Sequence, residues 1–531
     1  MKKLILLLIT TLTIISCSEA NEAEKISWTS TSEEAKVLFD KFLNNQEIRR
    51  AYPAVQETLM DSILELDPDF AMAKLNTAWN WPNTSREETR KRLLSAYDDR
   101  ENVSDLEKRI IIANFEGRIN GNGVEFDKIL DSLVNDYPQY YQLRLWSGDS
   151  KNGLQNPKDS QKRWEEAIEI NPNSFDGYVK LALLHFQFID GFTMLAAADR
   201  DLKKSEDLLL EGMRRHPNSS RWTRFLGNIY RAQAKMDKAE EAYKEASEIV
   251  ANNEEGPDSR AYAEMIYLIG HVKTFKGEFD EAREYYGKTI SMLESKNIIN
   301  AAGILDFYAH TYIYQKDFAK AIYVLSEFQD KLKNFDAEDI VKLNFDIFLE
   351  GTKFLAFGHS QKQEETLSSI NRIKELRAER LAIQLENAYD ENQKDRFNLN
   401  FKKQSMGDEI WYNILFGNYD DAGTLLSDFK IISDSQLTYS PNALNNYYKF
   451  SGYLNLMEGN PQDAIDSYSN VPDEVLTDDN YHLYFLALAK KALGKTEEST
   501  IMFTELANNN FATWQNAIVK NLAKSQIKTN L

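Results

Sequence analysis

The segment that could bind a nucleotide phosphate lies near the C-terminus and is incomplete. Ala489, Gly494, Lys495 and Thr496 match a relaxed form of the phosphate-binding loop, with alanine in place of the first glycine. Such a loop needs a strand before it and a glycine-rich turn with free backbone N–H groups. The preceding residues, LALAKKAL, instead have helical spacing, and Gly494 stands where a helix hairpin would turn. We therefore predict that no nucleotide binds.

Other residue types that carry out catalysis or bind metals are present, but their spacing does not match a known catalytic or metal-binding motif. The histidines show no HExxH motif, and no GxSxG motif marks a serine nucleophile. Adjacent carboxylates, such as Asp420 with Asp421, suit helix starts, where they accept backbone hydrogen bonds. The sequence thus predicts a protein that is not an enzyme and that uses no metal or cofactor. The histidines are His185, His216, His271, His310, His359 and His482.

Composition favours a folded, acidic protein. The chain has 531 residues, of which 83 are acidic and 63 basic, giving a formal net charge of −20. Hydrophobic residues make up 42% and aromatic residues 12%, which is enough apolar surface for a core. Nucleic-acid binding needs a basic patch, and no long run of lysine or arginine occurs. We therefore exclude nucleic acid as a partner.

The first residues have the pattern of an export signal. Two lysines precede an apolar run over residues 4–15, which is too short to span a bilayer comfortably. The only cysteine, Cys17, follows in TIISCSEA, which resembles the signal of Gram-negative bacterial lipoproteins.

That resemblance implies that residues 1–16 are a signal peptide and that Cys17 is the site of lipid attachment. Residues 17–31, which are polar and acidic, would form a flexible tether. The protein would be exported and held at the outer membrane, on its periplasmic face or at the cell surface. The alternative is an ordinary signal peptide followed by a cysteine that occurs there by chance.

Small and large residues recur at one fixed spacing in the middle of the chain. In LIGHVKTFKGEFDEAREYY, the small residues Gly270 and Ala282 are followed by the large residue Tyr286. The segments FLGNIYRAQAKMDKAEEAY, FYAHTYIYQKDFAKAIYVL and FSGYLNLMEGNPQDAIDSY repeat this pattern. Two antiparallel helices approach closely only where a small side chain faces the partner, so the pattern indicates packed hairpins. The spacing resembles the tetratricopeptide repeat, a helix hairpin of about 34 residues.

This resemblance implies an all-α solenoid with a right-handed superhelix, because one hairpin cannot bury its apolar face alone. We expect an N-terminal array over residues 32–360 and a C-terminal array over 405–510, followed by a capping helix and tail over 511–531. Residues 361–404 carry charges at helical intervals and would form a solvated connector between the arrays. Residues 189–198 are an insertion between hairpins and a candidate functional loop.

The same resemblance implies where a partner would bind. In tetratricopeptide solenoids the first helices of successive hairpins line a concave groove that holds a peptide. The chain would then be a non-enzymatic, membrane-anchored scaffold for an unidentified protein or peptide in the cell envelope. Arginine and aromatic residues are also common at interaction hot spots. The candidate groove residues are Arg221, Arg224, Asn228, Arg231, Tyr267, His271, Phe275, Asp306, His310 and Tyr314.

Two other functions stay open. Outer-membrane lipoproteins of the starch-utilisation type also combine a lipidated cysteine with tetratricopeptide-like helices and bind glycans or other nutrients. They carry long irregular insertions, whereas this chain is mostly continuous hairpins. An enzyme built as a helical toroid, such as a glycosidase, would need acidic side chains converging in one cavity. The hairpin pattern predicts an open superhelix instead.

Overall fold

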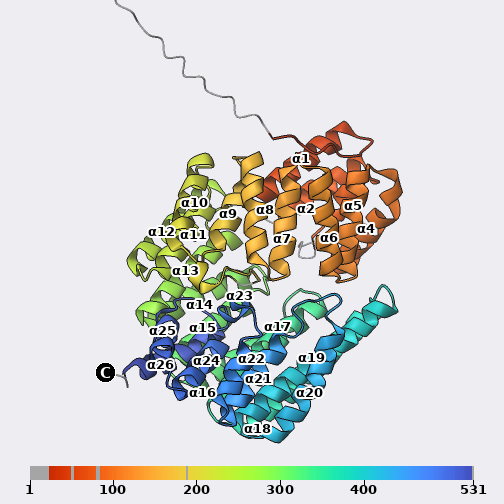
Figure 1. The fold of residues 1–531 in the computed structure, drawn as a ribbon. Helices are drawn as coiled ribbons and strands as arrows, with labels where there is room; N and C mark the ends of the chain where they lie inside the picture. The colour runs from red at the N-terminus through yellow and green to blue at the C-terminus, as the bar shows by residue number, and fades with distance from the viewer. Residues whose placement is uncertain (1–22, 49–52, 79–83, 187–188, 190, 529–531) are drawn as a thin grey trace, which may run out of the picture.

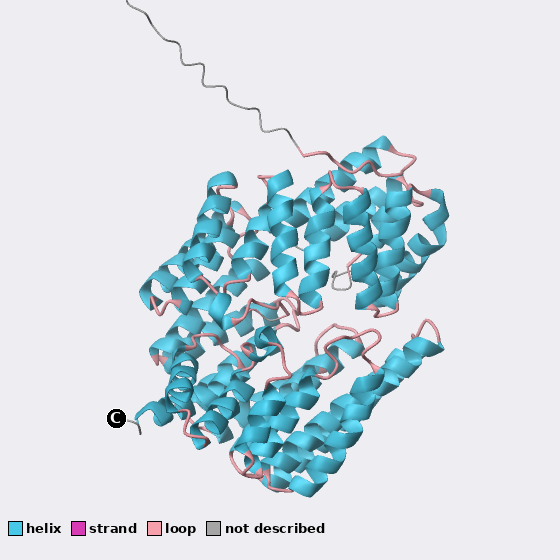
Figure 2. Ribbon diagram, in the orientation of Figure 1, coloured by secondary structure: helices cyan, strands magenta, loops and turns pink. Residues whose placement is uncertain are grey.

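The computed structural model describes residues 23–48, 53–78, 84–186, 189 and 191–528. Within these ranges the chain forms helices and loops and no strand (Figure 2). The prediction of an all-α solenoid is confirmed. The predicted signal peptide and Cys17 lie outside the described residues. None of the described helices is both long and apolar enough to cross a membrane.

The helices follow one another as packed hairpins (Figure 1). The first part of the chain contains α1 (Glu33–Ile48), α2 (Pro53–Leu66), α3 (Ala71–Leu75), α4 (Arg86–Asp98), η1 (Asp99–Asn102), α5 (Asp105–Asn114), η2 (Phe115–Ile119), α6 (Gly123–Asp136), α7 (Tyr141–Gly153), α8 (Pro157–Ile170), α9 (Phe175–Leu183), η3 (Ala197–Asp199) and α10 (Leu202–Arg215). The middle contains α11 (Ser220–Ala232), α12 (Met236–Asn253), α13 (Arg260–Lys276), α14 (Phe279–Ser295), α15 (Ala301–Tyr314) and α16 (Phe318–Leu332). The last part contains α17 (Asp339–His359), α18 (Gln363–Glu386), α19 (Glu391–Leu415), α20 (Tyr419–Ser435), α21 (Asn445–Met457), α22 (Pro461–Tyr468), α23 (Asp473–Leu476), α24 (Asn480–Ala492), α25 (Thr496–Asn508) and α26 (Trp514–Lys528).

Several hairpins are closed by a glycine on one helix and a large ring on the other. In α13 and α14, a Cβ added to Gly270 would lie 2.7 Å from Cε1 of Tyr286, well inside normal contact distance. In α11 and α12, the same arrangement joins Gly227 to Tyr243 at 2.5 Å. The helices therefore touch where the sequence spacing predicted. Equivalent pairs are Gly148 with Trp164 and Gly452 with Tyr468.

The hairpin of α15 and α16 solves the same packing problem with different residues. Ala309 stands at the glycine position and Leu325 at the ring position, and both are completely buried. A larger residue on the first helix is thus matched by a smaller one on the second. The volume at the contact stays filled, as a close-packed interior requires.

Residues 23–31 pack against the first hairpins instead of forming a flexible tether. Ile26 and Trp28 are buried, and the ring of Trp28 lies edge-on to Phe39 with 5.4 Å between centroids. The backbone N–H of Thr29 donates to Oε1 of Glu107 over 2.8 Å. The prediction of a tether is therefore wrong for this part, because its apolar residues find a place in the core.

Residues 361–404 form two long helices and not a single solvated connector. They comprise α18 and the first half of α19. α18 packs on α17, α19 packs on α20, and α18 and α19 pack on each other. The mostly buried ion pair between Arg377 and Asp408 joins them, as does the contact of Lys374 Nζ with Glu409 Oε1 at 3.1 Å. The charges at helical intervals thus hold neighbouring helices together, and the stack is continuous.

The curved stack brings its distant parts into contact, so it is closed rather than the open superhelix expected (Figure 1). These contacts lie outside the repeat pattern, which describes only neighbouring hairpins. The polar contacts that bridge the two sides include Gln393 Nε2 with Ile119 O at 2.6 Å, Asn442 Nδ2 with Leu154 O at 2.7 Å, and Arg200 Nη2 with Asp478 Oδ1 at 2.7 Å.

The described part of the insertion over residues 189–198 packs onto the hairpin that precedes it. The backbone N–H of Thr193 donates to Oδ1 of Asn152 over 3.0 Å, and Nδ2 of Asn152 donates to the Thr193 carbonyl over 2.7 Å. Met194 and Leu195 are buried. These contacts give this loop a structural role.

The last helix does more than cap the array. α26 packs on α24 and α25, as a capping helix would, and also on α15 in the middle of the chain. Residues 509–513, which precede it, have no helical structure. The C-terminal part of the chain thereby reaches the helices on which the candidate groove residues lie.

Candidate protein-binding groove

The ten candidate groove residues all lie on α11, α13 and α15, the first helices of three successive hairpins. Arg221, Arg224, Tyr267 and Phe275 are half-buried. The other six were expected to be exposed and are buried, which leaves little free surface for a partner. The buried residues are Asn228, Arg231, His271, Asp306, His310 and Tyr314.

The C-terminal segment of the same chain covers α11. Nδ2 of Asn510 donates to the carbonyl oxygen of Arg231 over 3.3 Å. The guanidinium of Arg231 lies over the ring of Phe511, 4.4 Å from its centroid, and both side chains are buried. A desolvated cation over an aromatic face is stabilising by on the order of 2 kcal/mol. The groove thus holds a non-helical segment, and that segment belongs to the protein itself.

Lys520 of α26 fastens the same segment to α13. Its Nζ lies 5.4 Å from the ring centroid of Phe275 and donates to the carbonyl of Asn509 and to Oδ1 of Asn510. These three partners are all neutral. Burial, together with a smaller effect of the positive charge of Lys524, lowers the pKa of Lys520 to about 7. A buried lysine with neutral partners therefore lies in the groove.

The segment also reaches α15. Nδ2 of Asn521 donates to the carbonyl of Tyr314 over 2.9 Å. Nearby, Nε2 of His310 lies 3.1 Å from Oδ2 of Asp306, and Oδ1 of Asp306 accepts a hydrogen bond from Thr352 over 2.5 Å. Burial lowers the pKa of His310, although the Asp306 charge opposes this shift. These candidate residues therefore interact within the protein.

Asn228 and His271 serve the packing of their own hairpins. The hydroxyl of Tyr243 donates to Oδ1 of Asn228 over 2.5 Å, and the hydroxyl of Tyr286 lies 2.7 Å from Nδ1 of His271. Burial, with the charge of Arg231, holds the pKa of His271 well below its usual value. Each of these polar residues directly follows the contact glycine of its hairpin, a signal that could have separated them from true groove residues.

The part of the groove that stays open is a cavity of about 530 Å³ between α13, α15 and residues 512–515. Glu264 on its wall lies 3.5 Å from Nη1 of Arg224 and 3.4 Å from Nε of Arg260. Both arginines are therefore partly neutralised. A site for a peptide carboxylate would need free positive charge at this point. This cavity is better suited to a neutral or basic group.

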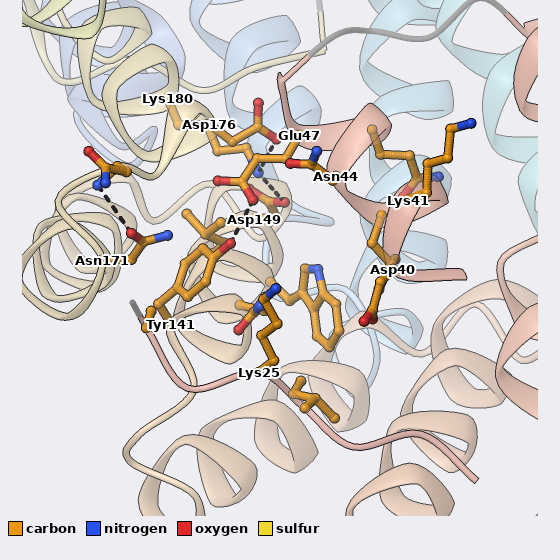
Figure 3. A pocket seen from close by; sticks show the side chains of 18 of the residues that line it. Lys25, Asp40, Lys41, Asn44, Glu47, Tyr141, Asp149, Asn171, Asp176 and Lys180 are labelled. Carbon is orange, nitrogen blue, oxygen red and sulfur yellow. Dashed lines mark hydrogen bonds and ion pairs between the residues drawn. The ribbon is translucent and has the colours of Figure 1, made fainter. Parts of the chain in front are cut away.

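A larger cavity of about 750 Å³ opens at the N-terminal hairpins, and we call it the N-terminal cleft (Figure 3). Residues 25–28, α1, α7 and α9 contribute to its wall. Glu47, near the end of α1, accepts hydrogen bonds from the hydroxyls of Tyr141 (2.7 Å) and Ser174 (3.0 Å). Burial raises the pKa of Glu47, while the bond from Tyr141 opposes the shift.

Ion pairs on α7, α9 and α11 form one side of the N-terminal cleft. Nζ of Lys180 lies 2.7 Å from Oδ2 of Asp149 and 3.6 Å from Oδ2 of Asp176. Burial raises the pKa of Asp149, and Lys180 opposes that shift. Nη1 of Arg221 lies 2.9 Å from Oδ1 of Asp176, so this candidate residue connects the N-terminal cleft to the groove.

The residues considered for catalysis or nucleotide binding have structural positions. Gly494 has a φ of 75° in the turn between α24 and α25, and Lys495 and Thr496 start the second of these helices. Asp479 caps α24, because its Oδ1 accepts from the backbone N–H of His482 over 3.2 Å. Within the described ranges no three His, Cys, Asp or Glu side chains come together as metal ligands.

Sequence reasoning missed the C-terminal segment as the occupant of the groove. The segment NNNFATW places Phe511 just ahead of the last helix and Trp514 at its first residue. Phe511 is buried against Arg231. A run of polar residues with isolated aromatics is a weak signal, and it does not say which surface buries them.

Comparison with known proteins agrees with the hairpin geometry. Residues 218–295 match the family model of the tetratricopeptide repeat, and they span α11 to α14. Two crystal structures of MamA are 19% identical to the chain with TM-scores of 0.28, covering 35% and 36% of it and 96% and 93% of their own chains. A crystal structure of nearly identical TPR-like repeats from Podospora anserina is 14% identical with a TM-score of 0.28, covering 42% of this chain and 96% of its own. A search of curated proteins gives no match. The match to the family model identifies tetratricopeptide repeats over residues 218–295.

Proposed function

We propose that the protein is a non-enzymatic scaffold that binds an extended polypeptide segment along the inner helices of its tetratricopeptide hairpins. The observation that carries the proposal is that the inner helices already hold a non-helical segment of the protein itself. Asn510 and Phe511 of this segment, residues 509–513, lie on Arg231 of α11, and Lys520 of α26 joins the segment to α13. A surface that accommodates non-helical chain through a backbone carbonyl, a guanidinium and an aromatic ring has the chemistry that peptide recognition uses.

The N-terminal cleft is the inner surface on which we place the partner. It offers the aromatic side chains of Tyr141 and Trp146 beside the ion pairs of Lys180. Exposed residues of α1, including Lys41 and Asn44, line its edge. A segment with polar and aromatic side chains would find partners of both kinds there.

Site-specific photo-crosslinking in intact cells tests this site. A photoreactive residue at Asn44, on the N-terminal cleft, is expected to capture one discrete partner. The matched control is Lys91, an exposed residue of α4 that pairs only with Glu87. Capture from Asn44 but not from Lys91 supports the proposal. Equal capture from both positions, or none from either, contradicts it.

We further propose that the protein is exported and anchored to the outer membrane through lipid on Cys17. The support is the sequence alone, since residues 1–22 lie outside the described part of the chain. Two or more acyl chains would each contribute about 0.8 kcal/mol per buried methylene, enough for stable anchoring. Metabolic labelling with an alkyne fatty acid should mark the wild-type protein and not Cys17→Ser. A labelled Cys17→Ser protein would disprove attachment at this residue.

A further inference from the structure

A cavity of about 1050 Å³ lies between the C-terminal hairpins and the loops around residues 121–123 and 153–155. We call it the central cavity. α17, α19 and α21 contribute to its wall, and Leu154 and Gln155 provide the opposite edge. Its volume is that of a small-molecule site. It does not overlap the N-terminal cleft.

Positive charge on the wall of the central cavity is only partly balanced. Lys449 Nζ lies 3.0 Å from Asp479 Oδ2, and Lys449 holds the pKa of Asp479 at about 2 in spite of burial. Lys403 has no carboxylate partner within the part of the chain that the structure describes. Its Nζ donates to Oε1 of Gln436 (2.8 Å) and to the carbonyl of Ala443 (2.9 Å), both neutral. Burial lowers the pKa of Lys403 to about 8.

A second cation next to the cavity is also held by neutral groups. Arg380 donates to Oδ1 of Asn344 (3.1 Å) and to Oε1 of Gln404 (2.9 Å), and Gln404 lines the cavity. Burial lowers the pKa of Arg380, and the charge of Arg377 adds to this effect. A protein with a net charge of −20 thus places uncompensated cations around one internal space. An anion bound there would remove the cost of burying them.

Beside the ion pair of Arg377 with Asp408 and the hydroxyls of Thr352 and Ser440, the central cavity has several carboxamides, which both donate and accept hydrogen bonds. They come from α19, α21 and the chain before α21, and they suit a ligand that is rich in hydroxyl groups. These carboxamides include those of Asn400, Gln404, Gln436, Asn442 and Asn446.

Aromatic side chains complete the site. Phe450 and Trp514 line the cavity, and Phe348 remains 44% exposed although it borders this space and the open part of the groove. Beside them, Nε1 of Trp411 is buried without a hydrogen-bond partner among the described residues. Ring faces and unsatisfied donors together favour a ligand with both C–H faces and polar edges.

We propose that the central cavity binds a small hydroxylated carboxylate, the chemistry of a sugar acid, with its carboxylate at Lys403 and its hydroxyl groups against the carboxamides. The proposal is independent of the protein partner at the N-terminal cleft.

Titration of the full-length protein with D-glucuronate, D-galacturonate and D-glucose tests this inference. Trp411 and Trp514 line the cavity, so their fluorescence reports binding directly. At least one of the acids is expected to bind about tenfold or more tightly than glucose, because only the acid can pair with Lys403. An oligogalacturonate included in the series shows whether the acid is recognised free or at a chain end.

Lys403→Met keeps the length of the side chain and removes its charge, so it should weaken binding of the acid about tenfold. Lys403→Arg should retain binding. Lys430→Met, on the outside of α20 where Lys430 pairs with Asp434, should have no effect. Melting temperatures of all three variants report whether they fold. The proposal is overturned if neither acid binds, if glucose binds equally well, or if a folded Lys403→Met variant binds as the wild type does.

Discussion

The groove of α11, α13 and α15 and the N-terminal cleft are both inner surfaces of the same helical stack, yet they differ in what covers them. In the groove, Asn510, Phe511 and Lys520 of the same chain occupy the surface. In the N-terminal cleft, Glu47 accepts a hydrogen bond from Tyr141 and Lys180 pairs with Asp149, and the space beside these contacts is open. The repeat pattern fixes how helices pack within a hairpin, but it does not fix what lies on their inner face.

The comparison suggests that the groove contributes to stability and the N-terminal cleft to recognition. Buried apolar and aromatic contacts, such as Phe511 against Arg231, resemble those of a core. In a cleft built from ion pairs and hydroxyl contacts, removing one contact lowers the free energy of unfolding less than removing a buried aromatic side chain from the groove does. Four substitutions examine this distinction, and their expected effects decrease in the order given.

Phe511→Ala should have the largest effect. Removing a buried phenylalanine leaves a cavity and lowers the free energy of unfolding by about 3–5 kcal/mol. Urea unfolding measures the loss, and hydrogen exchange should show faster exchange in α26. Tyr323→Ala, at a 59% exposed position of α16, is the control and should change stability by less than about 0.5 kcal/mol. If both variants behave alike, the segment is only loosely placed in the groove.

Gly270→Ala should have the second largest effect. It should lower the free energy of unfolding by about 1–3 kcal/mol, because the added Cβ would lie 2.7 Å from the ring of Tyr286. Gly287→Ala is the matched control. A Cβ at Gly287 meets nothing within 4 Å, so this variant should gain up to about 1 kcal/mol from helix propensity. Equal denaturation midpoints for the two variants would contradict the close contact between α13 and α14.

Lys520→Met should change how stability depends on pH. The folded-state pKa of Lys520 is lowered from 10.5 to about 7 by burial, so below pH 7 the charged form is buried at full cost. Between pH 7 and 10.5 the unfolded state binds more protons, and wild-type stability rises with pH. Relative to Lys520→Met, the wild type should gain about 2 kcal/mol between pH 6.5 and 9.

Lys524→Met is the control for that titration, since Lys524 is an exposed neighbour on the same helix. It should keep most of the wild-type pH dependence, because Lys524 contributes only the smaller part of the shift in the pKa of Lys520. A difference between wild type and Lys520→Met that stays constant from pH 6.5 to 9 would mean that this ammonium group is hydrated.

Tyr141→Phe should have the smallest effect. It removes one hydrogen bond to Glu47 in the N-terminal cleft and should cost about 0.5–1.5 kcal/mol. Partner capture by a photoreactive residue at Asn44 should fall more clearly than stability does. A loss of stability as large as that of Phe511→Ala would show that the N-terminal cleft is also part of the core.

The sequence predicted those features that depend on neighbouring hairpins. Gly270 and Tyr286 meet as expected, because their contact lies within one repeat. The packing of Trp28 against Phe39 and the placement of Phe511 on Arg231 could not be predicted. Phe511 and Arg231 lie far apart in sequence, and no periodic pattern relates them.

The sequence therefore predicted which helices carry the candidate residues, but it did not predict that most of these residues are buried. The helices α11, α13 and α15 follow from the repeat spacing, but the burial of His310 and Tyr314 depends on Asp306, Thr352 and the C-terminal helix. Residue type also gave the wrong exposure. A polar residue that hydrogen-bonds to a buried tyrosine hydroxyl cannot be distinguished in the sequence from a polar residue that faces solvent.

The bridges across the closed stack have a consequence for how such a protein can change its length. An ordinary array tolerates the gain or loss of one hairpin, since each unit touches only its neighbours. Here Arg200 meets Asp478, and Leu154 meets Asn442, across the molecule. One extra hairpin would rotate these partners away from each other. The number of hairpins between them should accordingly stay constant in any relative that keeps the bridges.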